Sequence, residues 1–99
     1  MQTLKKENYK NYLQLAQTGH YPLFFDEWVH ASMNQGSLIS LKRANHNVRS
    51  VFNLLDRHKT VEKKKTALMT LDKITREEFI RSFFKIVEHE VLKEDLTLQ

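Results

Sequence analysis

The chain has 99 residues, of which 40% are hydrophobic and 10% aromatic, and this composition excludes a disordered chain and favours one domain over residues 1–99. The absence of cysteine excludes a disulfide scaffold and a thiolate metal site. The net charge is +4, and no segment is apolar enough for a secretory signal or a membrane span, so we expect a cytoplasmic protein without a membrane role.

The basic residues are concentrated in the middle third of the sequence. Residues 1–36 contain three lysines and three acids, residues 37–65 contain eight Lys or Arg and two acids, and residues 66–99 contain five basic and seven acidic residues. A basic block between neutral and acidic flanks predicts one local surface that faces a polyanion.

Residues that favour turns are scarce. Gly19, Pro22 and Gly36 are the only glycines and proline, and none occurs from Ser37 to Gln99. Because Leu, Lys and Glu are abundant as well, the sequence predicts an all-α fold, an irregular bundle of four to five helices joined by short connections.

The first two predicted helices are separated by two of these breakers. A helix over about residues 4–17 can take Thr3 as its N-cap and Gly19, in the left-handed conformation, as its stop. Pro22 fits the first turn of a second helix, because the N–H that it lacks would have no partner there. Gly36 is expected to end that second helix.

Residues 38–58 form the clearest amphipathic segment. Their spacing of three and four predicts a long helix with one buried side. Thr60 can cap a short fourth helix that continues through Leu71. The apolar positions of the long helix are Leu41, Ala44, Val48, Val51, Phe52 and Leu55.

The start of a fifth helix carries two local signals. Thr75 and Glu78 have the spacing of a capping box, and Ile74 and Phe79 have the spacing of a hydrophobic staple. These signals predict a helix over residues 76–93.

Two apolar stripes run along this fifth helix and cover more than the roughly 100° that a surface helix normally buries. Either the other helices surround it, or part of it contacts another chain, and a symmetric homodimer is the commonest such arrangement. The residues of this predicted interface are Phe79, Ile80, Phe83, Phe84, Val87 and Val91.

The polar side of the third helix is the candidate nucleic-acid surface. Five of its residues follow one another at spacings of four, three, four and four, and no acid appears before Asp56. The order of a helix, the Gly36 turn and this helix is also that of a helix-turn-helix unit. The alternative is an ordinary solvated face. The predicted contacts are Lys42, Arg43, Arg49 and Arg57 with phosphates and His46, Asn47 and Asn53 with bases.

Two further groups are open to more than one interpretation. The lysines of residues 63–65 can extend the basic patch, although a solvated run explains them as well, because consecutive helical residues point in different directions. The aromatic group Tyr21, Phe24, Phe25 and Trp28 can stack bases or anchor a partner, but without basic residues between them core packing is the simpler reading.

No motif indicates a cofactor, a metal or a reaction. The five histidines lack metal-site spacing, and neither a nucleophile elbow nor a phosphate-binding glycine loop is present. His46, Val48, Arg49 and Ser50 resemble part of the phosphoacceptor helix of sensor histidine kinases, which would imply phosphotransfer at His46. The acidic residue beside the histidine and the downstream proline of that family are missing, so we expect no such activity.

The sequence therefore predicts a small, non-enzymatic DNA-binding protein, such as a regulator of transcription, that acts through the third helix and dimerises through the fifth. The alternative is a protein–protein interaction module, such as an adaptor, an inhibitor or a host modulator. That module would bind through the apolar fifth helix or the aromatic second helix.

Overall fold

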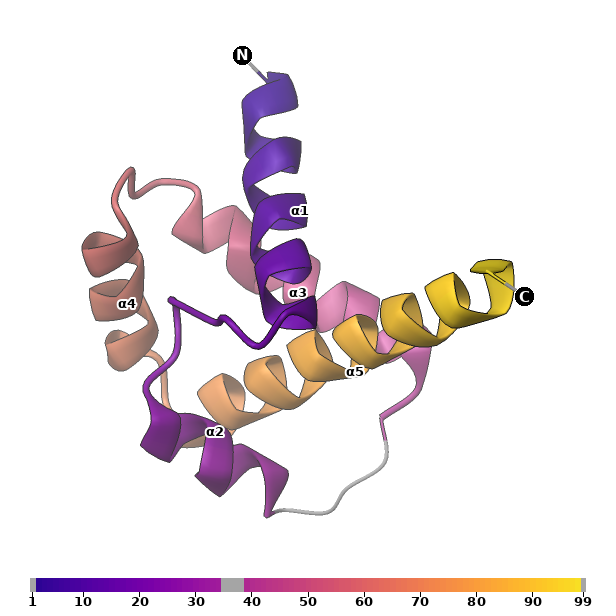
Figure 1. The fold of residues 1–99 in the computed structure, drawn as a ribbon. Helices are drawn as coiled ribbons and strands as arrows, with labels where there is room; N and C mark the ends of the chain where they lie inside the picture. Colours follow the sequence, from indigo (N-terminus) through magenta and orange to yellow (C-terminus); the bar gives the residue numbers. More distant parts are fainter. Residues whose placement is uncertain (1, 35–38, 99) are drawn as a thin grey trace.

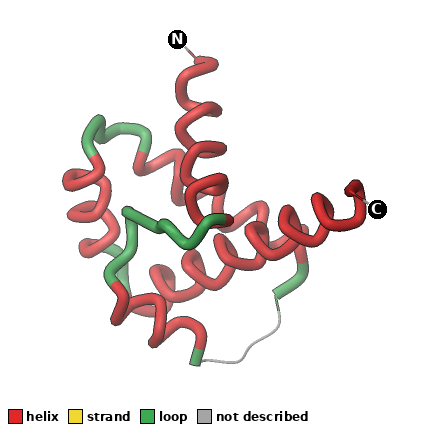
Figure 2. The backbone as a smooth tube through the Cα atoms, in the orientation of Figure 1, coloured by secondary structure: helices red, strands yellow, loops and turns green. Residues whose placement is uncertain are grey.

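The structure is a computed structural model and describes residues 2–34 and 39–98, with the side chains of residues 10–34 and 39–93. Within this part of the chain there are five helices and no strand, which confirms the predicted all-α bundle (Figures 1 and 2). The helices are α1 Gln2–Gln17, α2 Asp26–Met33, α3 Leu41–Leu55, α4 Val61–Thr70 and α5 Lys73–Leu98.

Helix α5 is the centre of the bundle. Helices α1, α2 and α3 all pack on α5, and α4 packs on α3 (Figure 1). The two apolar stripes predicted for α5 explain this position, because a helix that is apolar over more than one face must be covered on several sides. Among the described residues, no helix is long and apolar enough to cross a membrane.

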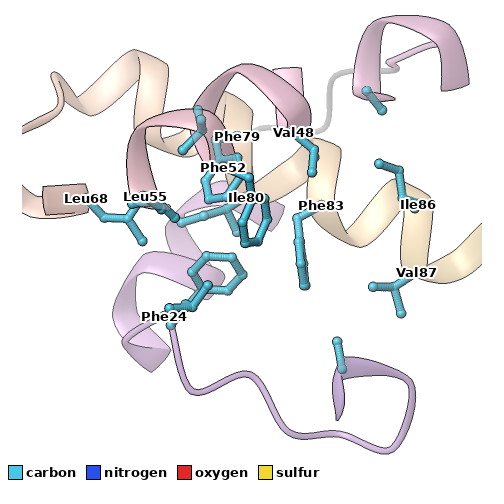
Figure 3. Close-up of a cluster of buried hydrophobic side chains, with 14 residues drawn as sticks. Phe24, Val48, Phe52, Leu55, Leu68, Phe79, Ile80, Phe83, Ile86 and Val87 are labelled. Carbon is cyan, nitrogen blue, oxygen red and sulfur yellow. The ribbon is translucent and has the colours of Figure 1, made fainter. Parts of the chain in front are cut away.

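Four phenylalanine rings meet in the middle of the core (Figure 3). The rings of Phe24 and Phe83 are 5.2 Å apart between centroids and lie edge to face at 88°, and Phe52 contacts both Phe79 and Phe83. Such pairs contribute about 0.5–1.5 kcal/mol each beyond the burial of their area. This cluster joins α3 and α5 to the connection that precedes α2.

The first two helices differ from prediction at their starts. Thr3 lies inside α1, which begins at Gln2, so Thr3 is not its N-cap. Gly19 has φ +91°, which confirms the left-handed stop. Helix α2 begins at Asp26 and not at Pro22, because the next two residues, Leu23 and Phe24, are drawn into the core before the helix starts. Helix α2 ends at Met33, and the predicted stop at residue 36 lies outside the described residues.

Helix α3 is continuous but shorter than the predicted range of 38–58. Ser40 caps it by accepting a hydrogen bond from the Arg43 backbone N–H at 3.2 Å, and Asp56 is its C-cap. Its predicted apolar stripe is buried from Ala44 to Leu55, with Ala44 and Val48 fully inaccessible, whereas Leu41 is half-buried. Residue 38 lies outside the described part of the chain.

Thr60 caps α4 as predicted. Its hydroxyl oxygen accepts a hydrogen bond from the Lys63 backbone N–H at 3.1 Å. Helix α4 ends at Thr70, so only Leu71 and Asp72 connect it to α5. Leu71 has extended backbone geometry, which sets the chain to begin α5 at once.

The capping box predicted for α5 is wrong, because Asp72 performs the capping. The Asp72 carboxylate accepts hydrogen bonds from the Thr75 backbone N–H at 3.0 Å and from the Thr75 hydroxyl at 2.7 Å. The helix therefore begins at Lys73 and not at Arg76. The hydrophobic staple is wrong as well, since the Ile74 side chain is 77% exposed.

We expect Asp72→Ala to lower the unfolding temperature at neutral pH and to lose this effect in acid. The hydrogen bonds from the Thr75 hydroxyl and backbone N–H lower the pKa of Asp72 from 3.8. A carboxyl group whose pKa is lowered by folding stabilises the fold above its ordinary pKa, and this contribution is lost as the pH falls through the lowered value.

Thermal unfolding of both chains between about pH 7 and pH 2 measures this difference. Asp72→Asn is the matched control, because it keeps a capping oxygen that does not titrate. A loss of stability in Asp72→Ala that is equal at both ends of the pH range would contradict the charged cap.

Candidate nucleic-acid interface

The polar face of α3, which we define as Lys42, His46, Arg49 and Asn53, is exposed along the whole helix. All four side chains are on the side opposite the buried Val48. Because the helix is unbroken from Leu41 to Leu55, it holds them in one row. The rise of 1.5 Å per residue makes this row about 16 Å long.

Arg43 forms an ion pair that joins α3 to α5. Its guanidinium is 3.1 Å from the Glu78 carboxylate of α5, and the Arg43 side chain is 64% exposed. Exposed ion pairs of this kind contribute about 0–1 kcal/mol. A phosphate can therefore replace Glu78 as the partner of Arg43 at small cost.

Asn47 does not belong to the exposed face. Its side-chain N–H donates to the hydroxyl of Ser82 on α5 at 3.0 Å, and Ser82 is fully buried. This hydrogen bond fixes how α3 sits on α5, so Asn47 is not presented to bases. Its spacing of three from Ala44 and four from Val51, both buried, places it at the edge of the apolar stripe.

Arg57 lies next to the polar face but not on the helix. Its backbone N–H donates to the Leu54 carbonyl at 3.3 Å in the turn after Asp56, and its side chain is exposed. Tyr12 is a residue of α1, and its pKa is raised by burial and, secondarily, by the negative charge of Asp56. Asp56 therefore lies close to α1. Arg57 therefore extends the basic surface beyond the end of α3.

The first turn of α3 contains Lys42 and Arg43 and no acid. The positive end of the helix dipole lies there, so cations cost about 0.3–1 kcal/mol each and an anion is favoured. Glu78 offsets part of this cost through Arg43. No such ion pair among the described residues offsets the cost of Lys42. A bound anion would offset it, so this turn is suited to one.

The helix-turn-helix unit predicted from the order of the elements is not formed. Helix α2 packs on α5, α3 also packs on α5, and residues 34–40 separate the two helices. Figure 1 shows α2 and α3 apart, with α5 between them in the view. A helix-turn-helix unit has a turn of about three to four residues between helices that contact each other.

The three consecutive lysines have three different environments. Lys63 is exposed, whereas Lys64 is buried and donates to the His58 carbonyl oxygen. The Lys65 ammonium lies 4.0 Å from the centre of the Phe25 ring. These residues therefore do not form one patch that continues the polar face of α3.

The aromatic group around α2 is divided between core and surface. Phe24 is buried, and Tyr21 packs edge to face on Phe84. Phe25 is 37% exposed and lies edge to face with Trp28, whose ring is covered by the Arg76 guanidinium at 4.8 Å. The sequence around α2 does not indicate the two cations that cover these rings, because Lys65 comes from α4 and Arg76 from α5, far along the chain.

The apolar residues predicted as an interface are used inside the chain. Phe79, Ile80, Phe83 and Val87 are buried beneath the helices that surround α5, and Phe84 and Val91 are half-buried against the same core. The surface of the folded chain does not offer the four buried side chains to another molecule.

The described part of the chain contains no candidate metal site. No group of three or more His, Asp or Glu side chains lies there in a position to hold a metal ion. In comparisons with known proteins, no family model, curated protein or solved structure matches this chain.

Proposed function

We propose that this chain is a small, non-enzymatic DNA-binding regulator that acts in the cytoplasm and contacts duplex DNA through α3. The observation that supports the proposal best is the polar face of α3, whose four side chains are exposed on one unbroken helix. The major groove of B-DNA is about 12 Å wide and admits a helix presented in this way.

The residue types divide by position along this surface. Lys42 and Arg49 reach phosphates on either side of the groove, and Arg57 reaches one beyond the end of the helix. His46 and Asn53 lie between the cations and carry the hydrogen-bonding groups that contact base edges. Arg43 joins them when it exchanges Glu78 for a phosphate.

A titration of duplex DNA at several salt concentrations tests this proposal. With three to four phosphate contacts, we expect the logarithm of the binding constant to fall against the logarithm of salt with a slope of about −3 to −4. No binding at low salt, or a constant that does not change with salt, would rule it out. Tighter binding of the single strand than of the duplex would contradict insertion into the groove.

A protein–protein interaction module is the second candidate, and one observation favours it. Phe25, the N-cap of α2, and Trp28 form a partly exposed aromatic surface at the start of α2, the helix for which partner binding was one of the predictions. The proteins recovered with this chain from a nuclease-treated and from an untreated lysate distinguish the two functions. A partner protein that is recovered equally from both, and is lost with Phe25→Ser but not with Arg49→Glu, would favour this candidate.

Phe84, one of the predicted interface residues, is not a position at which partner binding can be tested. The Phe84 ring contacts Tyr21, Phe24 and Phe83, so a charge at this position disrupts the core before it tests a surface.

A further inference from the structure

A small pocket lies between the C-terminal part of α3 and α4. Its volume is about 160 Å³. Small-molecule sites usually enclose about 300–1,000 Å³, whereas a cavity of about 150 Å³ holds one benzene ring. The pocket therefore has the size for a single apolar side chain. It is lined by Val51, Leu54, Leu55, Arg57, His58, Ala67, Thr70 and Leu71.

The pocket has an apolar interior and a basic margin. Of its apolar lining, Leu55 is buried and Leu54 is 45% exposed. Arg57 and His58 contribute the basic side chains of the lining, and no acid is among the described residues that form it. An apolar side chain with acidic residues around it is the complementary ligand.

The C-terminal part of α5 has this chemistry. Residues 88–92 contain two acids, Glu88 and Glu90, and no Lys or Arg. Leu92 is 55% exposed in this segment, and Glu88, one turn before it, is exposed as well. Figure 1 shows the last turns of α5 extending beyond the other helices.

This segment cannot reach the pocket of its own chain. Helix α5 is continuous from Lys73 to Leu98, and Leu71, which lines the pocket, comes two residues before its start. Leu92 is therefore about 30 Å along a straight helix from the pocket. Only the α5 of another molecule can bring such a leucine to it.

We propose that the pocket between α3 and α4 binds Leu92 and the acidic C-terminal part of α5 from a second copy of this chain. Reciprocal binding of both tails closes the assembly as a symmetric dimer. This dimer differs from the one predicted through the buried face of α5, and it does not depend on the proposed binding of DNA.

Sedimentation velocity at increasing protein concentration, without nucleic acid, tests the proposal. We expect the 11.8 kDa chain to form a dimer that weakens as salt rises, because the margin and the tail have opposite charges. Leu54→Asp and Leu92→Asp are each expected to raise the dissociation constant at least about tenfold. Met33→Asp, at an exposed apolar position on α2 that does not line the pocket, should leave the dimer unchanged.

Mixing the two variants provides the decisive measurement. The Leu54→Asp chain keeps its tail and the Leu92→Asp chain keeps its pocket, so together they should form a one-to-one complex that neither forms alone. If Leu92→Asp does not fold, as judged by circular dichroism, Glu88→Lys replaces it.

A monomer at every concentration, a dimer that neither variant weakens, or a mixture that fails to associate would each overturn the proposal. The salt titration with DNA is a separate measurement, so failure of the dimer and failure of DNA binding are distinguishable.

Discussion

Phe83→Ala is expected to destabilise the fold by about 3–5 kcal/mol. The Phe83 side chain is 1% exposed and contacts the rings of Phe24, Phe52 and Phe79, so its removal leaves a cavity where three segments meet. A domain of this size is stable by only about 5–15 kcal/mol. We therefore expect the unfolding temperature to fall by roughly 15–30 °C.

Urea and thermal denaturation followed by circular dichroism measure this loss. Ile74→Ala is the control on the same helix, and we expect it to change stability by less than about 0.5 kcal/mol because Ile74 is exposed. If Phe83→Ala does not fold, Ile80→Val gives a smaller loss of about 0.5–1.5 kcal/mol at a neighbouring buried position. A loss below about 1 kcal/mol for Phe83→Ala would contradict the central position of α5.

The helical periodicity of the sequence predicted the burial of α3 and α5 well. The residues of α3 that recur every three or four positions are buried in the structure, from Ala44 to Leu55. This succeeds because one helix face must pack on the core wherever the chain is helical. The second apolar stripe of α5 left two alternatives, a helix surrounded by the others or a contact with another chain. The structure shows the first, with α5 at the centre of the bundle.

The helix starts were harder to predict because several local signals compete there. Asp72 and Thr75 both suit an N-cap, and the connection of only two residues after α4 decides between them in favour of Asp72. Pro22 predicted the first turn of the second helix. Burial of Leu23 and Phe24 stabilises the fold more than an earlier start of α2 would, so the helix begins after them.

The sequence predicted the part of the candidate site that the periodicity of α3 alone determines. The row from Lys42 to Asn53 follows from spacing alone. The partners of Arg43 and Asn47 are 35 residues away on α5, and no local pattern indicates them. The cations that cover Phe25 and Trp28 were missed for the same reason, because they come from other helices.

The double variant Lys42→Glu and Arg49→Glu is expected to weaken binding of duplex DNA roughly 100-fold at about 0.1 M salt. Each phosphate contact contributes about 0.9 to the salt slope, so removal of two should reduce its magnitude by about 1.8. Fluorescence anisotropy with a labelled duplex measures both quantities.

Loss of fold would not explain this result. Glu at position 42 would lie in the first turn of α3, where an acid interacts favourably with the helix dipole by about 0.3–1 kcal/mol. The matched control is Lys10→Glu with Lys73→Glu, which changes the net charge equally at exposed positions on α1 and α5. Equal weakening by both pairs would show that only net charge matters and would contradict a site on α3.

Glu78→Gln extends the test in the opposite direction. Glu78 pairs with Arg43 in the free protein and competes with phosphate for it. Removal of its charge should therefore strengthen DNA binding a few-fold, since the pair is worth only about 0–1 kcal/mol. An anion that binds to α3 explains a gain from Glu78→Gln together with a loss from the double variant, whereas a surface that only keeps the protein in solution explains neither.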